Sequence, residues 1–272
     1  VMQPLLSIGV PTYNRAHLLS HFLRGLSREY AGLSEQDQVE FVVSDNCSED
    51  GTAAVVNEFQ KDLPIRYHRN ERNIGPAANV VQVPTLASGK YCWIFGDDDL
   101  IVPGALARVL KLLQAYPDVP AIVVGYSYQK EENRERYIGE EVPQIFERPV
   151  FGSNHPPKLV SRWEKTILET HSPAAHTSVV GCVFNTYLWR QHAPSPDVVE
   201  QAEPFSSLES TFPHTVTWAS FLIGREVVFA PKPHVYFFVG AQEWLKPKWV
   251  TILFTLCLEL SQYMLAKNAS EN

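Results

Sequence analysis

Three consecutive aspartates, Asp97, Asp98 and Asp99, follow a short apolar run that begins at Tyr91 and ends at Gly96. The run is typical of a buried strand, because it is mostly apolar and has a glycine on each side. Isolated carboxylates are very costly to bury, so we expect the aspartates at the carboxyl end of this strand, in or beside a crevice. Hard divalent cations prefer oxygen ligands. The cluster therefore predicts a metal site that faces a phosphate-bearing substrate.

Polar residues also follow two other predicted strands. A strand expected over residues 5–10 is followed by the stretch 11–15. A second strand, expected over residues 39–44, is followed by Asp45 and Asn46. In open α/β sheets the ligand lies beyond the carboxyl ends of the strands. We therefore expect these polar residues to line one edge of the sheet together with the aspartate cluster.

The elements that would position these residues alternate between strands and helices. Strands are expected at residues 5–10, 39–44, 65–68, 91–96 and 121–126. Apolar residues at helical spacing predict a helix over residues 16–30 and one that follows the turn at residues 48–52 and ends at about Phe59. Two more helices are expected over 73–87, with an interruption near Pro84, and over 104–116. This alternation predicts βαβ units and an α/β fold with a mostly parallel central sheet flanked by helices.

Beyond residue 126 the alternation of strands and helices is less regular. This half of the chain is expected to shape a second substrate pocket. We expect a helix at 161–169, a strand at 178–184, a short helix at 187–192, an acidic loop over 198–213, a helix at 214–223, strands at 227–230 and 235–239, and an amphipathic helix over 249–267.

The composition narrows the class of protein. The chain has 272 residues, of which 45% are hydrophobic and 19% charged, as in ordinary globular proteins. Its net charge of −7 argues against a nucleic-acid binder. The four cysteines are widely spaced, which indicates neither a zinc site nor a disulfide framework and favours a reducing compartment. No signal peptide or membrane-spanning segment is expected, so we predict a cytoplasmic protein.

Five motifs occur in order between residues 8 and 99. They are Ile8-Gly9-Val10-Pro11-Thr12-Tyr13-Asn14-Arg15, Val43-Ser44-Asp45-Asn46-Cys47-Ser48-Glu49-Asp50-Gly51-Thr52, Asn73-Ile74-Gly75-Pro76-Ala77-Ala78-Asn79, Ala87-Ser88-Gly89-Lys90-Tyr91 and Gly96-Asp97-Asp98-Asp99. Together they resemble the family 2 nucleotide-sugar glycosyltransferases, which have the Rossmann-like GT-A fold. The third and fifth look most like transferases of bacterial surface polysaccharides, the abequosyltransferase-like group included. Residues 130–272 carry no motif of comparable specificity.

The resemblance implies metal-binding roles for the aspartates. Asp97 and Asp99 form the D-x-D pair of such enzymes, and Asp99 would ligate Mn²⁺ or Mg²⁺ against the diphosphate. Asp97 or Asp98 would face the ribose or the waters on the metal. A metal there acts as a Lewis acid on the leaving nucleoside diphosphate. Capping of the next helix is the alternative role, but a cap needs only one aspartate.

The resemblance also implies a nucleotide site. Its residues would be Pro11, Thr12, Tyr13, Arg15, Asp45, Asn73, Asp97 and Asp98. Asp45 would accept a hydrogen bond from the base, although a turn-forming role is the alternative. Ser44 stands where many relatives carry a second aspartate. Tyr13 would cover the base and the backbone around Thr12 would touch it.

Two further nucleotide contacts are less specific. Arg15 could contact a phosphate or simply begin a surface helix. Asn73 would lie near the base and the ribose.

An inverting transfer, which the family implies, needs a general base on the acceptor hydroxyl. The family supplies an Asp or Glu just before a helix of the second half, here the helix over residues 214–223. Glu200, Glu203 and Glu209 precede it, and Glu209 has the best spacing. His214 is a competing base or phosphate contact. The usual Glu-Asp pair is missing.

The expected protein is a metal-dependent enzyme that moves a sugar from a nucleotide-diphosphate donor to a hydroxyl of a polysaccharide or lipid-linked acceptor. Residues 1–128 would bind the nucleotide sugar, residues 129–240 the acceptor, and residues 241–272 would form the amphipathic helix. Aromatic and basic residues between Trp244 and Trp249 suit contact with an anionic membrane surface, at the inner face of the plasma membrane. Packing on the domain or on a partner subunit is the alternative.

Two other functions stay open. A nucleotidyltransferase would also use a metal and aspartates at strand ends, but it normally has a glycine-rich basic loop, which residues 11–15 lack. A non-catalytic module that binds nucleotide sugars or polysaccharides is the second alternative, because no catalytic base is identified.

Overall fold

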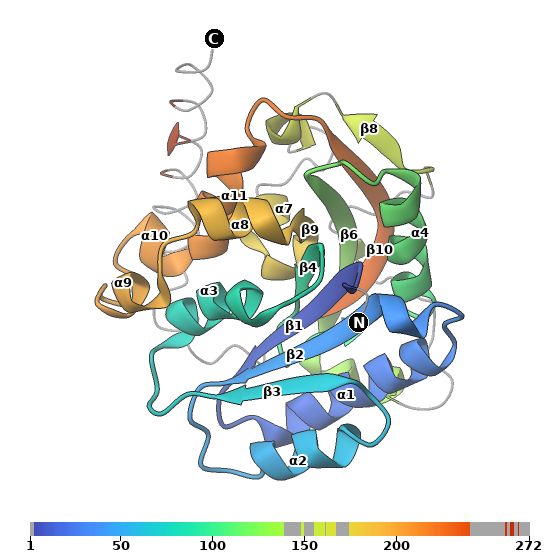
Figure 1. The fold of residues 1–272 in the computed structure, drawn as a ribbon, viewed down its shortest axis with the longest axis vertical. Coiled ribbons are helices and arrows are strands. Elements are labelled where there is room, and N and C mark those ends of the chain that lie inside the picture. The colour runs from blue at the N-terminus through green and yellow to red at the C-terminus, as the bar shows by residue number, and fades with distance from the viewer. Residues whose placement is uncertain are drawn as a thin grey trace.

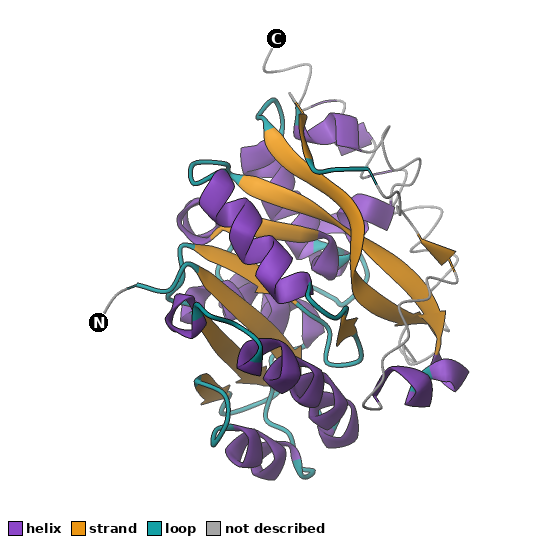
Figure 2. Cartoon of the chain, turned by 90° about the vertical axis from the view of Figure 1, so that its right-hand side faces the viewer, coloured by secondary structure: helices purple, strands orange, loops and turns teal. Residues whose placement is uncertain are grey.

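The computed structural model describes residues 3–138, 148–149, 155–160, 162–166 and 174–239, with residues 259, 262–263 and 266. A twisted sheet forms the centre of this part of the chain, and helices cover it on both sides (Figures 1 and 2). On one side lie α1 (Ala16–Ala31), α2 (Thr52–Phe59) and α4 (Ala105–Ala115). On the other side lie α3 (Pro76–Leu86), α8 (Thr186–His192) and α11 (Pro213–Leu222).

The first half of the sheet is parallel, as predicted. Its strands are β1 (Leu6–Thr12), β2 (Val39–Asp45), β3 (Ile65–Arg69) and β4 (Tyr91–Ile94). They lie in the order β3-β2-β1-β4, and every neighbouring pair runs parallel. Because the strands are parallel, their carboxyl ends meet at one edge of the sheet. The predicted βαβ arrangement of this half is confirmed.

The second half makes the sheet mixed. Its strands are β5 (Leu100–Ile101), β6 (Ala121–Lys130), β7 (Arg148–Pro149), β8 (Lys158–Val160), β9 (Cys182–Asn185) and β10 (Val227–Val239). The short strand β9 lies antiparallel between β4 and β6, and β6 runs parallel to the long strand β10. The α/β class is confirmed, with a curled sheet in the order β3-β2-β1-β4-β9-β6-β10-β5.

Shorter helices and 3₁₀ turns complete the described part of the second half. They are η2 (Glu131–Asn133), α5 (Glu135–Ile138), η3 (Trp163–Lys165), α7 (Ala174–Thr177), η4 (Val179–Gly181), α9 (Pro196–Glu200) and α10 (Leu208–Thr211). The turn η1 (Gln36–Gln38) precedes β2. No helix among the described residues is both long enough and apolar enough to cross a bilayer.

Four sequence-based predictions of elements are wrong. The stretch 198–213 is not only loop, because Pro196 opens α9 and the side chain of Ser207 caps α10. The two strands expected after residue 227 are one strand, β10, with shifts of register near Pro233. The strand expected from residue 178 begins only at Cys182, after the turn η4.

The fourth wrong prediction is the interruption near Pro84, since α3 continues to Leu86. The side chain of Arg190 donates hydrogen bonds to the carbonyl groups of Pro84 and Ala87, which satisfies backbone acceptors at this helix end. The helix expected over residues 249–267 lies outside the described residues, except for positions 259, 262–263 and 266. Of the helix expected over 161–169, only residues 162–166 are described, and they contain the 3₁₀ turn η3.

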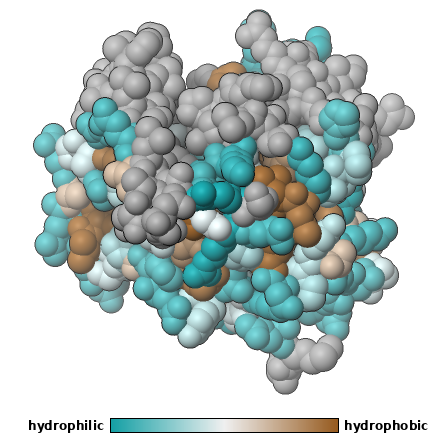
Figure 3. Space-filling model, turned by 90° about the horizontal axis from the view of Figure 1, so that it is seen from above, coloured by the Kyte–Doolittle hydropathy of each residue, from teal (hydrophilic) through white to brown (hydrophobic). Residues whose placement is uncertain are grey.

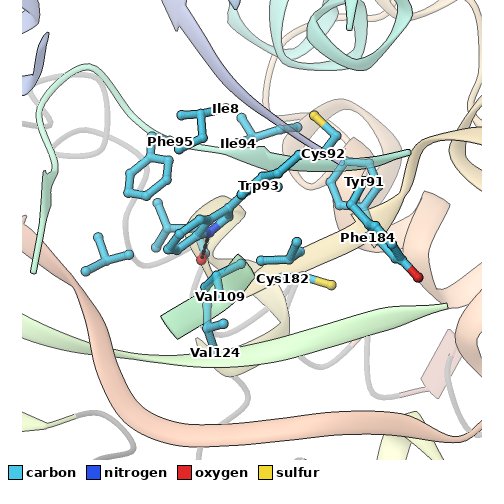
Figure 4. Packing of buried hydrophobic residues seen from close by; sticks show 14 of the residues in the cluster. Ile8, Tyr91, Cys92, Trp93, Ile94, Phe95, Val109, Val124, Cys182 and Phe184 are labelled. Atoms are coloured by element: carbon cyan, nitrogen blue, oxygen red, sulfur yellow. Dashed lines mark hydrogen bonds between the residues drawn. The ribbon is translucent and has the colours of Figure 1, made fainter. Parts of the chain in front are cut away.

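Strand β4 is held in the core from both sides. Its Trp93 is fully buried and donates a hydrogen bond to the carbonyl of Val180, 2.9 Å away (Figure 4). The rings of Trp93 and Phe95 lie 4.5 Å apart, and Phe95 also packs 5.1 Å from Phe22 of α1. Cys92 of the same strand is buried, as predicted. These contacts therefore fix the strand that immediately precedes the three aspartates.

A buried carboxylate fixes the start of β4. Glu40 of β2 accepts hydrogen bonds from Ser7 of β1, at 2.6 Å, and from Ser88 and Gly89, which precede β4. Burial raises the pKa of Glu40, but these hydrogen bonds outweigh it, so the pKa lies below its usual value. The ionised carboxylate thus joins three chain segments that lead to the ends of β1, β2 and β4.

Replacing Glu40 with glutamine should destabilise the fold at neutral pH. Hydrogen bonds to a charged group contribute about 1.5–3 kcal/mol each, and the amide nitrogen of glutamine cannot accept them, so we expect a loss of about 2 kcal/mol. Because the folded pKa is lowered, this stability is present above the unfolded pKa of about 4.3 and is lost as the pH falls through the folded value. Urea unfolding at pH 7 and pH 4 measures both effects.

The exposed Glu58 of α2 is the matched control for this experiment. The variant Glu58→Gln should unfold like the wild type at both pH values. A Glu40→Gln protein with wild-type stability at pH 7, or one whose deficit grows in acid, would contradict the role assigned to Glu40.

Candidate functional site at the acidic turn

The residues 96–99 that follow β4, here called the acidic turn, place three carboxylates in the protein interior. Asp97, Asp98 and Asp99 are 4%, 7% and 1% exposed. Burial raises the pKa of all three, that of Asp97 to about 6, and their mutual repulsion adds to the effect for Asp97 and Asp99. The turn therefore lies at the strand end, as expected, but it needs compensating groups around it.

The end of β1 supplies part of this compensation. The hydroxyl of Thr12 donates to Asp97 Oδ2 at 2.7 Å. Arg15 Nη1 donates to Asp97 Oδ1 at 3.1 Å and to Asp98 Oδ2 at 3.3 Å. The charge on Arg15 opposes the rise in pKa of both aspartates. Arg15, a predicted phosphate contact, is thus bonded to carboxylates in this structure.

Asp99 differs from its neighbours because one of its carboxylate oxygens has no hydrogen-bond partner among the described residues. Its Oδ2 accepts a hydrogen bond from the backbone N–H of Gly96 at 3.3 Å, whereas its buried Oδ1 accepts none from them. A Cβ atom on Gly96 would lie 2.6 Å from Asp98 Oδ1 and 2.9 Å from Asp99 Oδ2, so any other residue at this position would displace these carboxylates. The free oxygen Oδ1 is the best candidate ligand for a cation.

The acidic turn fits a divalent cation that takes most of its ligands from a substrate. Within the described ranges, no three His, Cys, Asp or Glu side chains converge as a ready-made metal site. Mg²⁺ is commonly bound through one or two carboxylates together with substrate phosphates. One free buried oxygen on Asp99 matches that mode of binding.

A second arginine at the acidic turn was not anticipated from the sequence. Arg134, which follows η2, is 4% exposed, and its Nη2 donates to the backbone carbonyl of Asp98 at 2.6 Å. It lies within a charged stretch, residues 130–136, that is typical of a solvated surface. No periodicity or motif marks Arg134 as a buried residue.

The ends of β2 and β3 form a second polar cluster around Asp45. Asp45 is fully buried, and its Oδ1 accepts from the N–H of Ser48 at 2.8 Å. Its Oδ2 accepts from the hydroxyl of Tyr67 at 2.5 Å and lies 3.7 Å from Arg69 Nε. Burial and the bond to Asp45 raise the pKa of Tyr67. Both oxygens are engaged, so contact with a nucleobase would require Asp45 to exchange a partner.

The loops after β1, β2 and β3 are bonded to one another, as the strand-end argument predicts. Asn46 donates its backbone N–H to the carbonyl of Thr12 at 2.9 Å and its side chain to Asn73 Oδ1 at 2.7 Å. Asn73 also accepts from the N–H of Gly75 at 2.9 Å, which orders the turn before α3. Asn73 therefore lies beside the second polar cluster.

Pro11 and Tyr13 flank Thr12, whose hydroxyl and carbonyl are hydrogen-bonded to Asp97 and to Asn46, one residue of each cluster. Pro11 is a half-buried residue of β1, and Tyr13 follows the strand with 42% of its surface exposed. The next residue, Asn14, has φ of 52° and accepts a hydrogen bond from the N–H of Glu49 at 2.7 Å. The Tyr13 ring is thus a large accessible aromatic group at the edge where the strand ends meet.

Neither predicted base is hydrogen-bonded to the acidic turn in the described part of the chain. Glu209 is exposed on α10, and no ion pair or hydrogen bond of its side chain is found among the described residues. His214, in the first turn of α11, is 6% exposed, and its Nε2 donates to the carbonyl of Thr177 at 2.9 Å. Burial lowers the pKa of His214 to about 4, although the bond to Thr177 opposes this shift.

The surface seen in Figure 3 is mainly hydrophilic over the described residues, with apolar groups in separate patches. The large hydrophobic side chains with the greatest exposure in the described part are Tyr13, Leu159, Tyr187, Val198 and Val239. Among these, Tyr13 alone belongs to the predicted site.

Comparisons with known proteins agree with these motifs. The family model described as "Glycosyl transferase family 2" matches residues 7–173, more than half of the chain. The abequosyltransferase RfbV of Salmonella typhimurium is 37% identical over 117 residues, which cover 42% of this chain and 34% of that protein. A GalNAc(5)-diNAcBac-PP-undecaprenol beta-1,3-glucosyltransferase of Campylobacter jejuni is 34% identical over 110 residues, 40% of this chain and 34% of that protein. The matched stretches thus span about a third of these relatives.

Solved structures share the fold. TarS 1-349 of S. aureus, in complex with UDP-GlcNAc, superposes with a TM-score of 0.65 at 18% identity, over 98% of this chain and 66% of that one. The mannosyltransferase PcManGT of Pyrobaculum calidifontis, in complex with GDP-Man and Mn²⁺, gives a TM-score of 0.56 at 17% identity, over 99% of this chain and 74% of that one. The predicted GT-A architecture is confirmed at the level of the fold.

Replacing His214 with glutamine should flatten the loss of stability in acid. The pKa of a histidine in an unfolded chain is about 6.5, and burial lowers that of His214 to about 4. Between these values only the unfolded chain takes up the proton, so stability falls as the pH drops from 6.5 towards 4. The substitution should reduce this slope by up to about 1.4 kcal/mol per pH unit. Urea unfolding at several pH values measures it.

The variant His17→Gln is the control, because His17 is exposed on α1. It should keep the wild-type slope. An unchanged slope in His214→Gln would show that His214 is not buried in its neutral form.

Proposed function

Because the chain belongs to glycosyl transferase family 2, we propose that it transfers a sugar from a nucleoside-diphosphate donor to a hydroxyl group of a saccharide acceptor. The observation that carries the proposal is the free buried oxygen of Asp99 in a turn whose other carboxylate oxygens are held largely by Thr12 and Arg15. Such a turn has one oxygen in place for a cation and the negative charge to attract it. A diphosphate is the substrate group that needs this cation.

The reaction follows from the groups that the chain supplies. The acceptor oxygen attacks the anomeric carbon, the bond from that carbon to the phosphate oxygen breaks, and the nucleoside diphosphate leaves with the electron pair. The proton of the acceptor hydroxyl passes to a general base. A bound Mn²⁺ or Mg²⁺ supplies Lewis-acid stabilisation of the charge on the diphosphate. Attack opposite to the leaving group inverts the anomeric carbon, as the family implies.

Within this proposal the aspartates have different tasks. Asp99 offers its free Oδ1 to the cation. Asp97 and Asp98 hold Arg15 beside the turn, where its side chain, 26% exposed, can contact a phosphate. Asp97 joins the metal or the ribose only if it releases Thr12 or Arg15.

The nucleoside lies along the neighbouring strand ends in this proposal. The exposed ring of Tyr13 covers the base, and the backbone at Pro11 and Thr12 lines its edge. Asp45 and Asn73 recognise the base and ribose from the second polar cluster. A bound base would add to, or replace, the hydrogen bonds that Ser48 and Tyr67 donate to Asp45.

We assign the general base to Glu209 rather than His214. A base must reach the acceptor hydroxyl, and the Glu209 carboxylate is exposed, whereas the His214 ring is buried and engaged with Thr177. An acceptor carried on a lipid diphosphate is supported by the name of the Campylobacter relative. Membrane contact through residues 241–272 stays a prediction, because only positions 259, 262–263 and 266 of that segment are described.

Replacing Asp99 with asparagine should abolish transfer, with a loss of activity of at least about a hundredfold. The reason is that the neutral amide cannot replace a charged carboxylate as a metal ligand. The assay incubates the protein with a panel of nucleotide sugars, MnCl₂ and a saccharide acceptor, and follows release of nucleoside diphosphate. The exposed Asp62, replaced in the same way, is the control and should keep wild-type activity.

The same assay separates the alternative functions. Pyrophosphate released from a nucleoside triphosphate would identify a nucleotidyltransferase. Binding of a nucleotide sugar without any release of diphosphate would indicate a binding module. An active Asp99→Asn protein would refute the proposed site.

Replacing Glu209 with glutamine should lower kcat by about 10²–10⁴-fold with little change in the donor KM, as expected for loss of a general base. The variant His214→Gln should keep kcat within a few-fold at a temperature where it is folded. Steady-state kinetics with saturating donor measure both. The reverse result would move the base to His214.

A further inference from the structure

One peptide group of the acidic turn is held from both sides. The peptide that joins Asp98 to Asp99 accepts a hydrogen bond at its carbonyl from Arg134 Nη2, at 2.6 Å. Its N–H, which belongs to Asp99, donates to the carbonyl of Gly96 at 3.2 Å. Rotation of this peptide would break both bonds and swing the Asp99 carboxylate. Its orientation therefore decides where the free Oδ1 of Asp99 lies.

Arg134 is itself held by two groups outside the turn. Its Nε and Nη2 donate to the two carboxylate oxygens of Glu131 at 2.6 Å and 2.7 Å, a bidentate pair. Its guanidinium carbon lies 4.1 Å from the centre of the Phe238 ring of β10, within the range of cation–π attraction. The planar guanidinium thus has a fixed orientation when it meets the Asp98 carbonyl.

The charge on Arg134 also acts on the turn. Burial raises the pKa of Asp98 and of Asp99, and the nearby positive charge of Arg134 opposes the rise for both. Arg15 reaches the side chains of Asp97 and Asp98, whereas Arg134 reaches the backbone. The two arginines therefore stabilise different parts of the same turn.

We infer that Arg134 is a positioning residue that fixes the Asp98–Asp99 peptide and so sets the Asp99 carboxylate for the cation of the donor complex. The inference rests on the proposed function. Arg134 acts through the backbone of the turn and not on the reacting atoms. Groups that orient a metal ligand typically change metal affinity about 10–100-fold when they are removed.

Mn²⁺ affinity in the absence of turnover tests the inference. The full chain is titrated with MnCl₂ in the presence of a nucleoside diphosphate, and free Mn²⁺ is followed by electron paramagnetic resonance. The variant Arg134→Met removes every donor but keeps an apolar chain against Phe238, and we expect its Kd for Mn²⁺ to rise about 10–100-fold. In Arg134→Lys a single ammonium can still reach the carbonyl, so we expect a smaller rise.

The matched control is Arg136→Met, because Arg136 is exposed two residues further along the chain. It should bind Mn²⁺ like the wild type. A purely structural role of Arg134 predicts a lower melting temperature with unchanged Mn²⁺ affinity, measured where circular dichroism shows both proteins folded. Unchanged affinity in the folded Met and Lys variants would overturn the inference, and the Lys variant decides the question if the Met variant does not fold.

A crystal structure of the Arg134→Lys or Arg134→Met protein separates this inference from the proposed function. We expect a reoriented Asp98–Asp99 peptide, and an unmoved peptide would refute the positioning role. A wild-type protein that binds no Mn²⁺ would count against the proposed function, and the peptide orientation would still decide the role of Arg134.

Discussion

Burial of three carboxylates on one tight turn is the constraint on which the rest of the site depends. Each buried negative charge is costly unless opposite charges and hydrogen-bond donors lie close by. The turn receives them from two distant parts of the chain, the end of β1 with Thr12 and Arg15, and Arg134 beyond β6. The sheet order places β1 directly beside β4, which brings the first of these groups within hydrogen-bond distance.

The compensation is incomplete, and this is the feature on which the proposed cation site rests. Two guanidinium groups face three aspartates together with Glu131, so negative charge is in excess. Within the part of the chain that the structure describes, one buried oxygen, Asp99 Oδ1, has no hydrogen-bond partner. An unsatisfied buried acceptor of this kind destabilises the isolated protein, and a cation would relieve it. Local instability at the turn is therefore compatible with selective binding of a metal–diphosphate complex.

In the second polar cluster, by contrast, the buried carboxylate has partners for both of its oxygens. Asp45 is as deeply buried as the acidic turn, but Ser48, Tyr67 and Arg69 satisfy its carboxylate. Asn46 then joins the loops after three strands into one network. A satisfied network of this kind makes the strand-end loops rigid and presents Tyr13 at the surface. One cluster thus forms a rigid edge, and the other leaves one carboxylate oxygen without a hydrogen-bond partner among the described residues.

The sequence by itself determined the first half of the fold, because periodic apolar runs and turn residues are local signals, and it placed the strand ends with Thr12, Asp45 and Asp97 on one edge. It also determined the family, through motifs that are contiguous in the chain. Only the tertiary structure decided which groups neutralise the aspartates. Arg134 lies 35 residues beyond Asp99 in a stretch that looks solvated, and its burial depends on Glu131 and on Phe238 of β10. Such contacts join segments with no local pattern in common, so only the packed fold specifies them.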